Sequence, residues 1–351
     1  MPQPGMTPAR PGPANPIFNI VLHLPLCWRM KRRHSPEHAL PIARPHSRLI
    51  TRRRLLTGLG VTTFAGLSVG GYAFGVEPHW RLDITRYAVS PPGWPPDLDL
   101  SIAVIADLHA GEPLMSADRV AAIAARTNAL RPDLVVLLGD FAASHRFAGR
   151  PVAPQAWSEA LSIVRAPLGV HAVLGNHDWW DDPAAQRNGK GPVVGRRVLE
   201  NVGIPVYEND AVRLSKGGRP FWLAGLGDQL ALIDRSGPRR RFRGVDNLPG
   251  TLAKVTDEAP VVLLAHEPDV FVDVPDRVAL TLAGHTHGGQ VRAFGYSPVV
   301  PSLYGNRFAY GHVVESDRHL VVSGGLGCSM LPVRLGVPPE IVIVDVAASA
   351  A

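Results

Sequence analysis

The sequence predicts an α/β fold, a four-layer αββα sandwich of two mixed β-sheets with helices on the outside. Strand-like apolar runs alternate with helical patterns between residues 100 and 283, as in parallel sheets that helices cover. Two later runs, 320–323 and 341–344, have no helix between them, which favours antiparallel strands that complete the second sheet. Five of the earlier runs end in a polar cluster, and ligands of such folds bind at the carboxyl ends of strands.

The predicted domain is slightly acidic, although the whole sequence has a formal net charge of +6. Residues 1–56 hold ten of the 36 basic residues and one of the 30 acidic residues, which leaves a net charge of −3 for the rest. The positive charge therefore belongs to the leader. It does not indicate nucleic-acid binding by the domain, and no nucleic-acid partner is expected.

The leader has the features of an export signal. Residues 1–50 are rich in proline and arginine and are predicted to be a disordered basic leader, or to reflect a start site placed too early, with Met30 beginning a more ordinary signal. Residues 51–76 contain three arginines, two leucines and then an uncharged stretch, which resembles a twin-arginine signal. The alternative is a basic flank before a transmembrane anchor, since about 20 residues can span a bilayer.

We therefore expect export across the cytoplasmic membrane by the twin-arginine machinery. The predicted location is the periplasm or the outer face of the membrane, with the signal either removed or kept as an anchor. Residues 77–97 are predicted to be a proline-rich linker, and residues 98–346 the globular domain. Cys27 lies in the leader and Cys328 is alone in the domain, so the domain must be stabilised by its core without an internal disulfide.

The first half of the domain alternates strands with helices. A strand at 100–106 runs into Asp107-Leu108-His109, and Ser116 is a suitable N-cap for a helix at 117–130. A continuous apolar run at 134–138, typical of a parallel strand buried on both faces, ends in Gly139-Asp140. The pattern continues with a helix near 155–164, a strand at 169–174 that ends in Gly175-Asn176-His177-Asp178, and a helix near 193–201.

The second half supplies three more strands before the two late runs. They are predicted at 221–225, at 261–265 and at 278–283. The second of these ends in His266, and the third runs into Gly284-His285-Thr286-His287. A basic loop, Arg239-Arg240-Arg241, and a short helix near 248–255 lie between the first and the second.

The polar clusters have the residue types of a metal site. Asp107 and His109 are two residues apart in an extended chain, so both side chains can reach one ion. His285 and His287 suit metal ligation because neutral imidazole is the commonest protein metal ligand. An isolated pair of this kind is as compatible with a solvated turn, but the four clusters upstream favour a metal site.

Taken in order, the five clusters resemble the signature of the calcineurin-like metallophosphoesterase superfamily. That signature is a series of Asp-x-His, Gly-Asp, Gly-Asn-His-Asp/Glu, His and Gly-His-x-His motifs, and the resemblance covers about residues 98–346. The later stretches 304–308, 324–327 and 331–336 look like the subgroup of exported, twin-arginine-type phosphodiesterases.

The resemblance implies a site with two divalent metal ions. One ion would be held by Asp107, His109, Asp140 and His287, and the other by Asp140, Asn176, His266 and His285. Asp140 would bridge the two ions. Nitrogen and oxygen ligands without sulfur fit manganese, iron or zinc.

The implied activity is that of a dimetal hydrolase, a phosphoesterase that cleaves phosphodiester or pyrophosphate bonds by attack of a metal-bound hydroxide. His177 would stabilise charge or protonate the leaving oxygen, and Asp178 would orient His177. The expected substrate is a phosphate ester of the envelope: a phospholipid, a nucleotide-linked lipid or a wall polymer, with a membrane surface as a further partner. The alternatives are a phosphomonoesterase and, in another class, a catalytically inactive metal-binding envelope module.

A few residues outside the motifs admit two interpretations. Tandem tryptophans such as Trp179 and Trp180 are mostly core residues, but these two adjoin the site and could contact an apolar leaving group. Asp228 is compatible with a place in the pocket or in a turn. Packing or surface roles are predicted for the remaining histidines of the predicted domain, which are His145, His171, His312 and His319.

Overall fold

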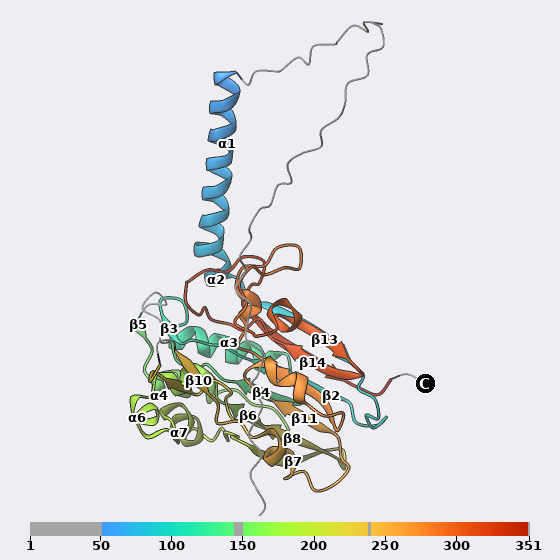
Figure 1. The fold of residues 1–351 in the computed structure, drawn as a ribbon. Helices are drawn as coiled ribbons and strands as arrows, with labels where there is room; N and C mark the ends of the chain where they lie inside the picture. Colours follow the sequence, from blue (N-terminus) through green and yellow to red (C-terminus); the bar gives the residue numbers. More distant parts are fainter. Residues whose placement is uncertain (1–50, 144–149, 238–239, 350–351) are drawn as a thin grey trace, which may run out of the picture. The chain divides into compact units, whose positions relative to one another are not determined.

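Two β-sheets packed face to face form the centre of the computed structural model, which describes residues 51–143, 150–237 and 240–349 (Figure 1). Within these residues, the first sheet has five strands in the order β1-β15-β2-β4-β6, and the second has six in the order β13-β14-β12-β11-β8-β7. The strands of the first sheet are β1 (Asp83–Val89), β15 (Glu340–Val346), β2 (Leu100–Ile105), β4 (Leu134–Leu138) and β6 (Val170–Val173). Those of the second are β13 (Gly311–Glu315), β14 (Arg318–Val322), β12 (Val278–Ala283), β11 (Val261–Leu264), β8 (Arg219–Gly225) and β7 (Asp210–Lys216). Two small antiparallel pairs are β3 (Gly111–Glu112) with β5 (Arg150–Pro151), and β9 (Leu232–Asp234) with β10 (Arg241–Arg243).

Helices and helical turns connect most of the strands. The α-helices are α1 (Arg52–Gly71), α2 (Glu77–Trp80), α3 (Ala117–Ala129), α4 (Pro154–Leu161), α5 (Asn176–Trp180), α6 (Pro183–Asn188), α7 (Val194–Asn201) and α8 (Leu248–Leu252). A π-helical turn, η1 (Tyr72–Val76), and three 3₁₀ turns, η2 (Pro268–Asp273), η3 (His287–Gly289) and η4 (Gly305–Phe308), complete the set. Ser116 caps α3 as predicted, because its side chain accepts a hydrogen bond from the backbone N–H of Arg119.

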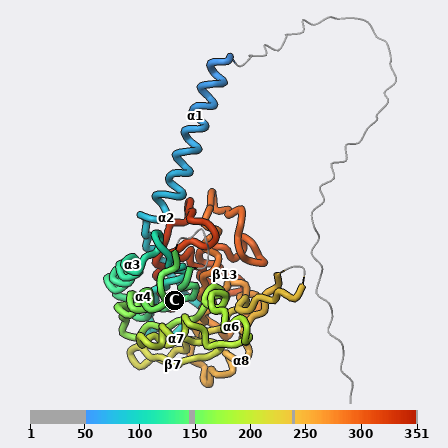
Figure 2. The backbone as a smooth tube through the Cα atoms, turned by 90° about the vertical axis from the view of Figure 1, so that its left-hand side faces the viewer, coloured from blue at the N-terminus to red at the C-terminus, as the bar shows by residue number. Residues whose placement is uncertain are grey.

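The alternation of side chains along each strand builds four layers. Ile102 and Val104 of β2 belong to the core between the two sheets, whereas Ala103 and Ile105 belong to the core beneath the helices. Figure 2 shows α3, α4 and α7 along one side of the domain, where they cover the first sheet. A third core, which includes Phe271 of η2, lies on the outer face of the second sheet. The predicted αββα sandwich of mixed sheets is confirmed.

The prediction for the two late strands was right for the first and wrong for the second. β14 joins the second sheet, where it is antiparallel to β13 and parallel to β12. β15 instead joins the first sheet, antiparallel to β2 and parallel to β1. Its residues Ile341 to Val344 are all buried because the strand lies inside the sheet, where both faces are covered.

Three edge strands were missed. The segment predicted to be a linker, 77–97, contains α2 and β1, and β1 pairs with β15 along seven residues. β7 and β13 form the two edges of the second sheet. All three strands are largely half-buried or exposed, so none carries the continuous apolar run that identifies a central strand.

The segment predicted to be a signal or anchor, 51–76, is helical. In the part of the chain that the structure describes, one helix, Arg52–Trp80, is long and apolar enough to cross a membrane. A signal sequence near the N-terminus would meet the same criteria. The predicted leader 1–50, His145 and Arg239 lie outside the described residues.

The packing of α4 supports the end of β4. Trp157 of α4 is buried and its ring stacks on Phe141, with centroids 5.3 Å apart. We predict that Trp157→Ala lowers the free energy of unfolding by about 3 to 5 kcal/mol, because it removes a buried aromatic side chain and leaves a cavity. Urea denaturation would measure this. Ile163→Ala, at a partly exposed position just after α4, is the control and should cost less than about 1 kcal/mol. Equal midpoints for the two variants would contradict the prediction.

Candidate metal centre

The seven side chains predicted to bind metal ions meet at the carboxyl ends of five strands. They are Asp107 and His109 after β2, Asp140 after β4, Asn176 after β6, His266 after β11, and His285 and His287 after β12. All seven are buried. The first sheet supplies four of them and the second sheet three, so the cluster lies across the two layers.

Their donor atoms form two groups with Asp140 between them. Asp107, His109 and His287 offer ligand atoms within 4.8 Å of one another, and so do Asp140, His266 and His285. Oδ2 of Asp140 is 3.4 Å from Nε2 of His109 and 3.3 Å from Nε2 of His266. A carboxylate in this position reaches both groups, as a bridging ligand must.

The orientations of the imidazoles fit cations. His266 donates from Nδ1 to the carbonyl oxygen of Leu138 at 2.6 Å, which turns Nε2 toward the carboxylate of Asp140, 3.3 Å away. Nε2 of His109 lies 3.0 Å from Nε2 of His287, and Nδ1 of His285 lies 2.9 Å from Oδ1 of Asn176. Nitrogen and oxygen atoms crowded in this way are the donor set of a transition-metal site without thiolate.

The electrostatics of the pocket also favour bound cations. Burial raises the pKa of Asp107 to about 7. Burial opposes ionisation of Asp140 too, but His266, His177 and His109 hold its pKa well below the ordinary value. Burial, reinforced by His109, keeps the pKa of His287 well below its ordinary value, so this ring is neutral and can ligate.

The backbone turns sharply at the candidate ligands. Asp107, His109, Asp140, His285 and His287 all have φ between 43° and 68°, in the left-handed region that side chains other than glycine rarely adopt. Such strain gathers at functional sites and persists only where the surrounding structure imposes it. The turn after each strand directs these side chains over the edge of the sheet.

The motif at 284–287 begins with glycine because the carboxylate of Asp107 lies close to the backbone there. A Cβ atom on Gly284 would lie 2.7 Å from Oδ2 of Asp107. The absence of a side chain there lets the carboxylate of Asp107 accept hydrogen bonds from the backbone N–H of His285, at 3.0 and 3.1 Å.

Asp178 holds the backbone around Asp140. Its Oδ2 accepts from the N–H groups of Asp140 and Gly175, each at 2.9 Å, and its Oδ1 accepts from the N–H of Phe141 at 3.0 Å. These contacts differ from the predicted role of Asp178, which was to orient His177; that role stays a prediction. Burial, followed by repulsion from Asp140, raises the pKa of Asp178 to about 7.

His177 lies beside the cluster, next to two aromatic side chains. Its backbone N–H donates to Oδ1 of Asp140 at 2.8 Å, and its ring lies 4.9 Å from the ring of His109. Trp180 lies 4.9 Å from His177 on the other side and stacks on Phe242 of β10 at 5.1 Å. Trp179 is buried in the core, whereas Trp180 is only half-buried. The tandem tryptophans therefore have different surroundings.

A hollow of about 420 Å³ lies beside Trp180. Its lining residues are Trp180, Pro183, Gln186, Arg187, Ile233 and Arg235. Among the residues that the structure describes, its lining includes two arginines and no carboxylate. Because Trp180 contacts both the hollow and His177, a substrate group that extends from the cluster over this ring would reach positive charge.

Two buried groups near the cluster, Asp228 and Arg334, had an open role or none in the sequence analysis. Asp228 accepts from the backbone N–H of Leu230 at 2.8 Å in a turn, and it also groups with His266 and Glu267. Arg334 is completely buried, and Nη2 lies 3.2 Å from Nδ1 of His287. The stretch 331–336 did stand out in the sequence, but a basic side chain gives no sign that it will be buried beside a ligand.

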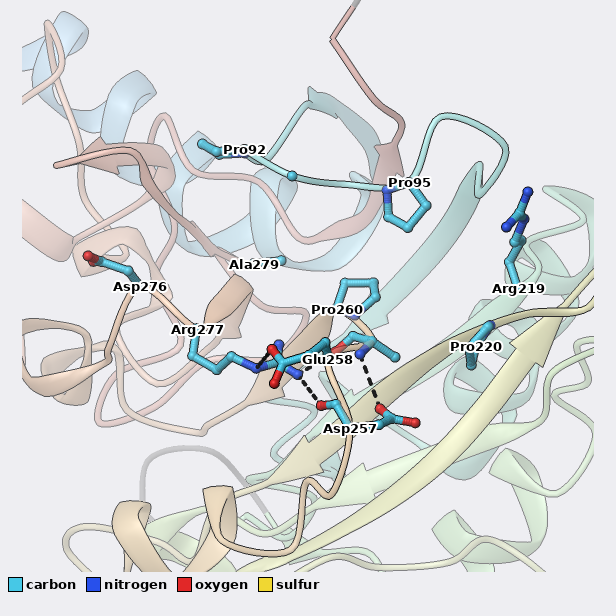
Figure 3. Close-up of a pocket in the computed structure, with 12 residues that line it drawn as sticks. Pro92, Pro95, Arg219, Pro220, Asp257, Glu258, Pro260, Asp276, Arg277 and Ala279 are labelled. Atoms are coloured by element: carbon cyan, nitrogen blue, oxygen red, sulfur yellow. Dashed lines mark hydrogen bonds and ion pairs between the residues drawn. The ribbon is translucent and has the colours of Figure 1, made fainter.

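A cavity of about 480 Å³ lies at the opposite end of the parallel strands (Figure 3). Its lining includes Arg219 and Pro220 at the start of β8, Pro260 just before β11 and Ala279 near the start of β12. Its charged groups are paired within the protein, for example Arg219 with Asp97. It takes no part in the candidate metal centre.

Comparison with known proteins identifies relatives along most of the chain. The model of the family described as "Calcineurin-like phosphoesterase" matches residues 100–289. The chain is 29% identical over 304 residues to the "Uncharacterized metallophosphoesterase YkuE" of Bacillus subtilis (strain 168), a match of 84% of this chain and 96% of that protein. It is 30% identical to the "Phosphodiesterase YaeI" of Escherichia coli (strain K12), over 85% of this chain and 99% of that protein. It is 28% identical to the "Transmembrane protein with metallophosphoesterase domain" of Danio rerio, over 81% of this chain and 61% of that protein.

Asp178 offers a direct test of the backbone clamp. In Asp178→Asn an NH₂ group replaces one of the two oxygens that accept hydrogen bonds. At least one buried backbone N–H then faces a donor instead of an acceptor. We predict a loss of about 1 to 3 kcal/mol in the free energy of unfolding, together with a lower metal content. Denaturation and elemental analysis would measure the two effects. The control is Asp273→Asn, the same substitution at an exposed position. Two variants with the same stability and metal content would refute the clamp.

Arg334 is predicted to position His287. Three nitrogens of its guanidinium donate to three carbonyl oxygens, each over 2.9 Å: Nε to Gly327, Nη1 to Val337 and Nη2 to Gly324. Arg334→Met should weaken metal binding about 10- to 100-fold, the usual effect of losing a group that orients a ligand. Titration with a competing chelator would measure this.

Stability separates this positioning role from a purely structural one. Arg334→Met should also lower the free energy of unfolding by about 3 kcal/mol, because three buried carbonyl groups lose their donor. The control Arg213→Met removes an exposed ion pair with Asp257 and should cost about 1 kcal/mol or less. Lower stability with unchanged metal affinity would show that Arg334 supports the loop and does not position His287.

Proposed function

This chain belongs to the calcineurin-like phosphoesterase family, and from that membership we propose that it hydrolyses phosphodiester or pyrophosphate bonds with two divalent metal ions. The observation that carries the proposal is the place of Asp140 between two buried groups of Asp and His donors. Two ions about 3.5 to 4 Å apart can act on one phosphoryl group, and a bridging carboxylate suits that spacing.

The proposed ligands are those that the motifs imply. Asp107, His109, Asp140 and His287 would hold one ion, and Asp140, Asn176, His266 and His285 the other. Manganese, iron or zinc would suit these donors. When bound, the ions would supply Lewis-acid activation of water and of a phosphoryl oxygen.

His177 is the proposed proton donor to the leaving oxygen. Its imidazole lies between the rings of His109 and Trp180, each 4.9 Å away, so it is next to the candidate ligands and to the hollow that Trp180 lines. Its main chain is fixed by the hydrogen bond to Asp140, so the ring stays next to the reacting centre. Asp178 would act one step away by holding the backbone of Asp140.

Trp180 and the hollow beside it favour a substrate with a large leaving group. Trp180 offers an aromatic face, and the hollow next to it provides Arg187 and Arg235. A diester or a pyrophosphate places a second group in this direction, whereas a monoester with a small alcohol does not. One relative is named a phosphodiesterase, which supports the same preference.

Export is part of the proposal. The arginines at 52–54 and the apolar helix that follows them suit a twin-arginine signal or an anchor. The enzyme would then act in the envelope, on a phospholipid, a nucleotide-linked lipid or a wall polymer. Relatives named as transmembrane proteins are consistent with action at a membrane.

The first test compares bis(p-nitrophenyl) phosphate with p-nitrophenyl phosphate as substrates of the full chain, with Mn²⁺, Fe²⁺ or Zn²⁺ added. We predict metal-dependent hydrolysis with the higher kcat/KM for the diester. Asp140→Asn should lower kcat/KM about 10³-fold, since metal ions contribute several kcal/mol to such reactions. The exposed Asp273→Asn is the matched control. Preference for the monoester would indicate a phosphomonoesterase, and metal binding without any turnover would contradict catalysis.

A further inference from the structure

Large apolar side chains are exposed on three segments of the described chain. The segments are 72–80, 290–304 and 328–333, and together we call them the apolar rim. The large hydrophobic residues exposed on it are Phe74, Val76, Trp80, Phe294, Tyr296, Val299, Leu303, Tyr304, Met330 and Leu331. Phe294 is fully exposed and Leu303 is 91% exposed. Soluble monomers rarely collect so many on one surface unless that surface binds something.

Hydrogen bonds join the three segments into one surface. The side chain of Gln290 donates to the carbonyl oxygens of Leu331 and Val333, each at 3.0 Å. The backbone N–H of Arg334 donates to the carbonyl oxygen of Ala73 at 3.0 Å, and that of Val337 to Oε1 of Glu77 at 3.0 Å. Figures 1 and 2 both show orange and red loops beside α2.

The apolar rim is almost free of charge. Segment 290–304 contains one charged residue, Arg292, and segment 328–333 contains none. In segment 72–80 the only acid, Glu77, is buried. A soluble surface normally has about a quarter to a third of its residues charged. Trp80, Tyr296 and Tyr304 instead belong to the two residue types that accumulate where a protein meets lipid headgroups.

We propose that the apolar rim docks on the surface of a lipid bilayer. A bilayer is favoured over a protein partner because the rim is continuous with α1, whose apolar side chains are all exposed. A helix of 20 residues is about 30 Å long, enough to cross the hydrocarbon core. The end of such a helix would bring segment 72–80 to the headgroups, and the two loops bonded to it would meet the same layer.

Docking would also set the place of the active site. η3 begins at His287, and segment 290–304 follows it directly. Arg334 links the same histidine to segment 328–333. The candidate metal centre would thus lie close to the layer of the headgroups. The docking itself needs no catalytic activity, so it can fail or hold independently of the proposed function.

Depth-dependent fluorescence quenching tests the docking on the full chain. Cys27→Ser removes the cysteine of the leader, and Cys328 is buried. Phe294→Cys and Leu303→Cys would each be labelled with nitrobenzoxadiazole and reconstituted in vesicles of phosphatidylcholine and phosphatidylglycerol. Val314→Cys, exposed on β13, is the control that reports only tethering near the membrane. Unchanged thermal unfolding would show that the substituted chains are folded.

We expect lipids with a spin label on the acyl chain to quench the labels at 294 and 303 at least about twofold more than the label at 314, because apolar loop tips would be buried in the headgroup and acyl boundary. Equal quenching at all three positions would overturn the proposal. It would also be overturned if emission at 294 and 303 changed with protein concentration but not with spin-labelled lipid, since the rim would then bind a second copy of the chain.

Discussion

The carboxylate of Asp140 is the point on which the rest of the site depends. It is buried, it lies within 3.4 Å of imidazoles from both sheets, and it also receives the backbone N–H of His177. A buried carboxylate is costly unless positive charge or hydrogen-bond donors surround it. The histidines supply these partners, and Asp178 fixes the main chain from which the carboxylate projects. The neighbouring residues therefore supply together the partners that the buried carboxylate of Asp140 requires.

Rigid packing makes this arrangement possible. Phe141 follows Asp140 and stacks on Trp157, so the position of the carboxylate is tied to a helix on the outside of the sandwich. The left-handed backbone at five candidate ligands is held in the same way, by strands whose residues have no freedom to relax it. Arg334 extends this support to His287 from a loop far away in the sequence. The strained backbone at the strand ends therefore persists because the core around it is rigidly packed.

The sequence predicted the parts of the fold that have strong local signals. A central parallel strand such as β4 must be apolar on both faces, so its run of five aliphatic residues and the aspartate after it could be located without a structure. β1 and β7 lie at sheet edges and lack that signal. The sheet to which β15 belongs depends on a connection across the sandwich, which no local pattern records. The contacts of Asp178 could not be foreseen either, because its partners are backbone N–H groups, and every residue but proline has one.

The division of the candidate ligands between the two sheets has a mechanical consequence. Asp107, His109, Asp140 and Asn176 come from one sheet, and His266, His285 and His287 from the other. Ions bound among them would clamp the open edge of the sandwich, so that the layers could not slide or part without breaking coordination bonds. Such a clamp can close only after both halves of the chain have folded and packed. Loading with metal would then be the last step of maturation, completed in whichever compartment the chain folds.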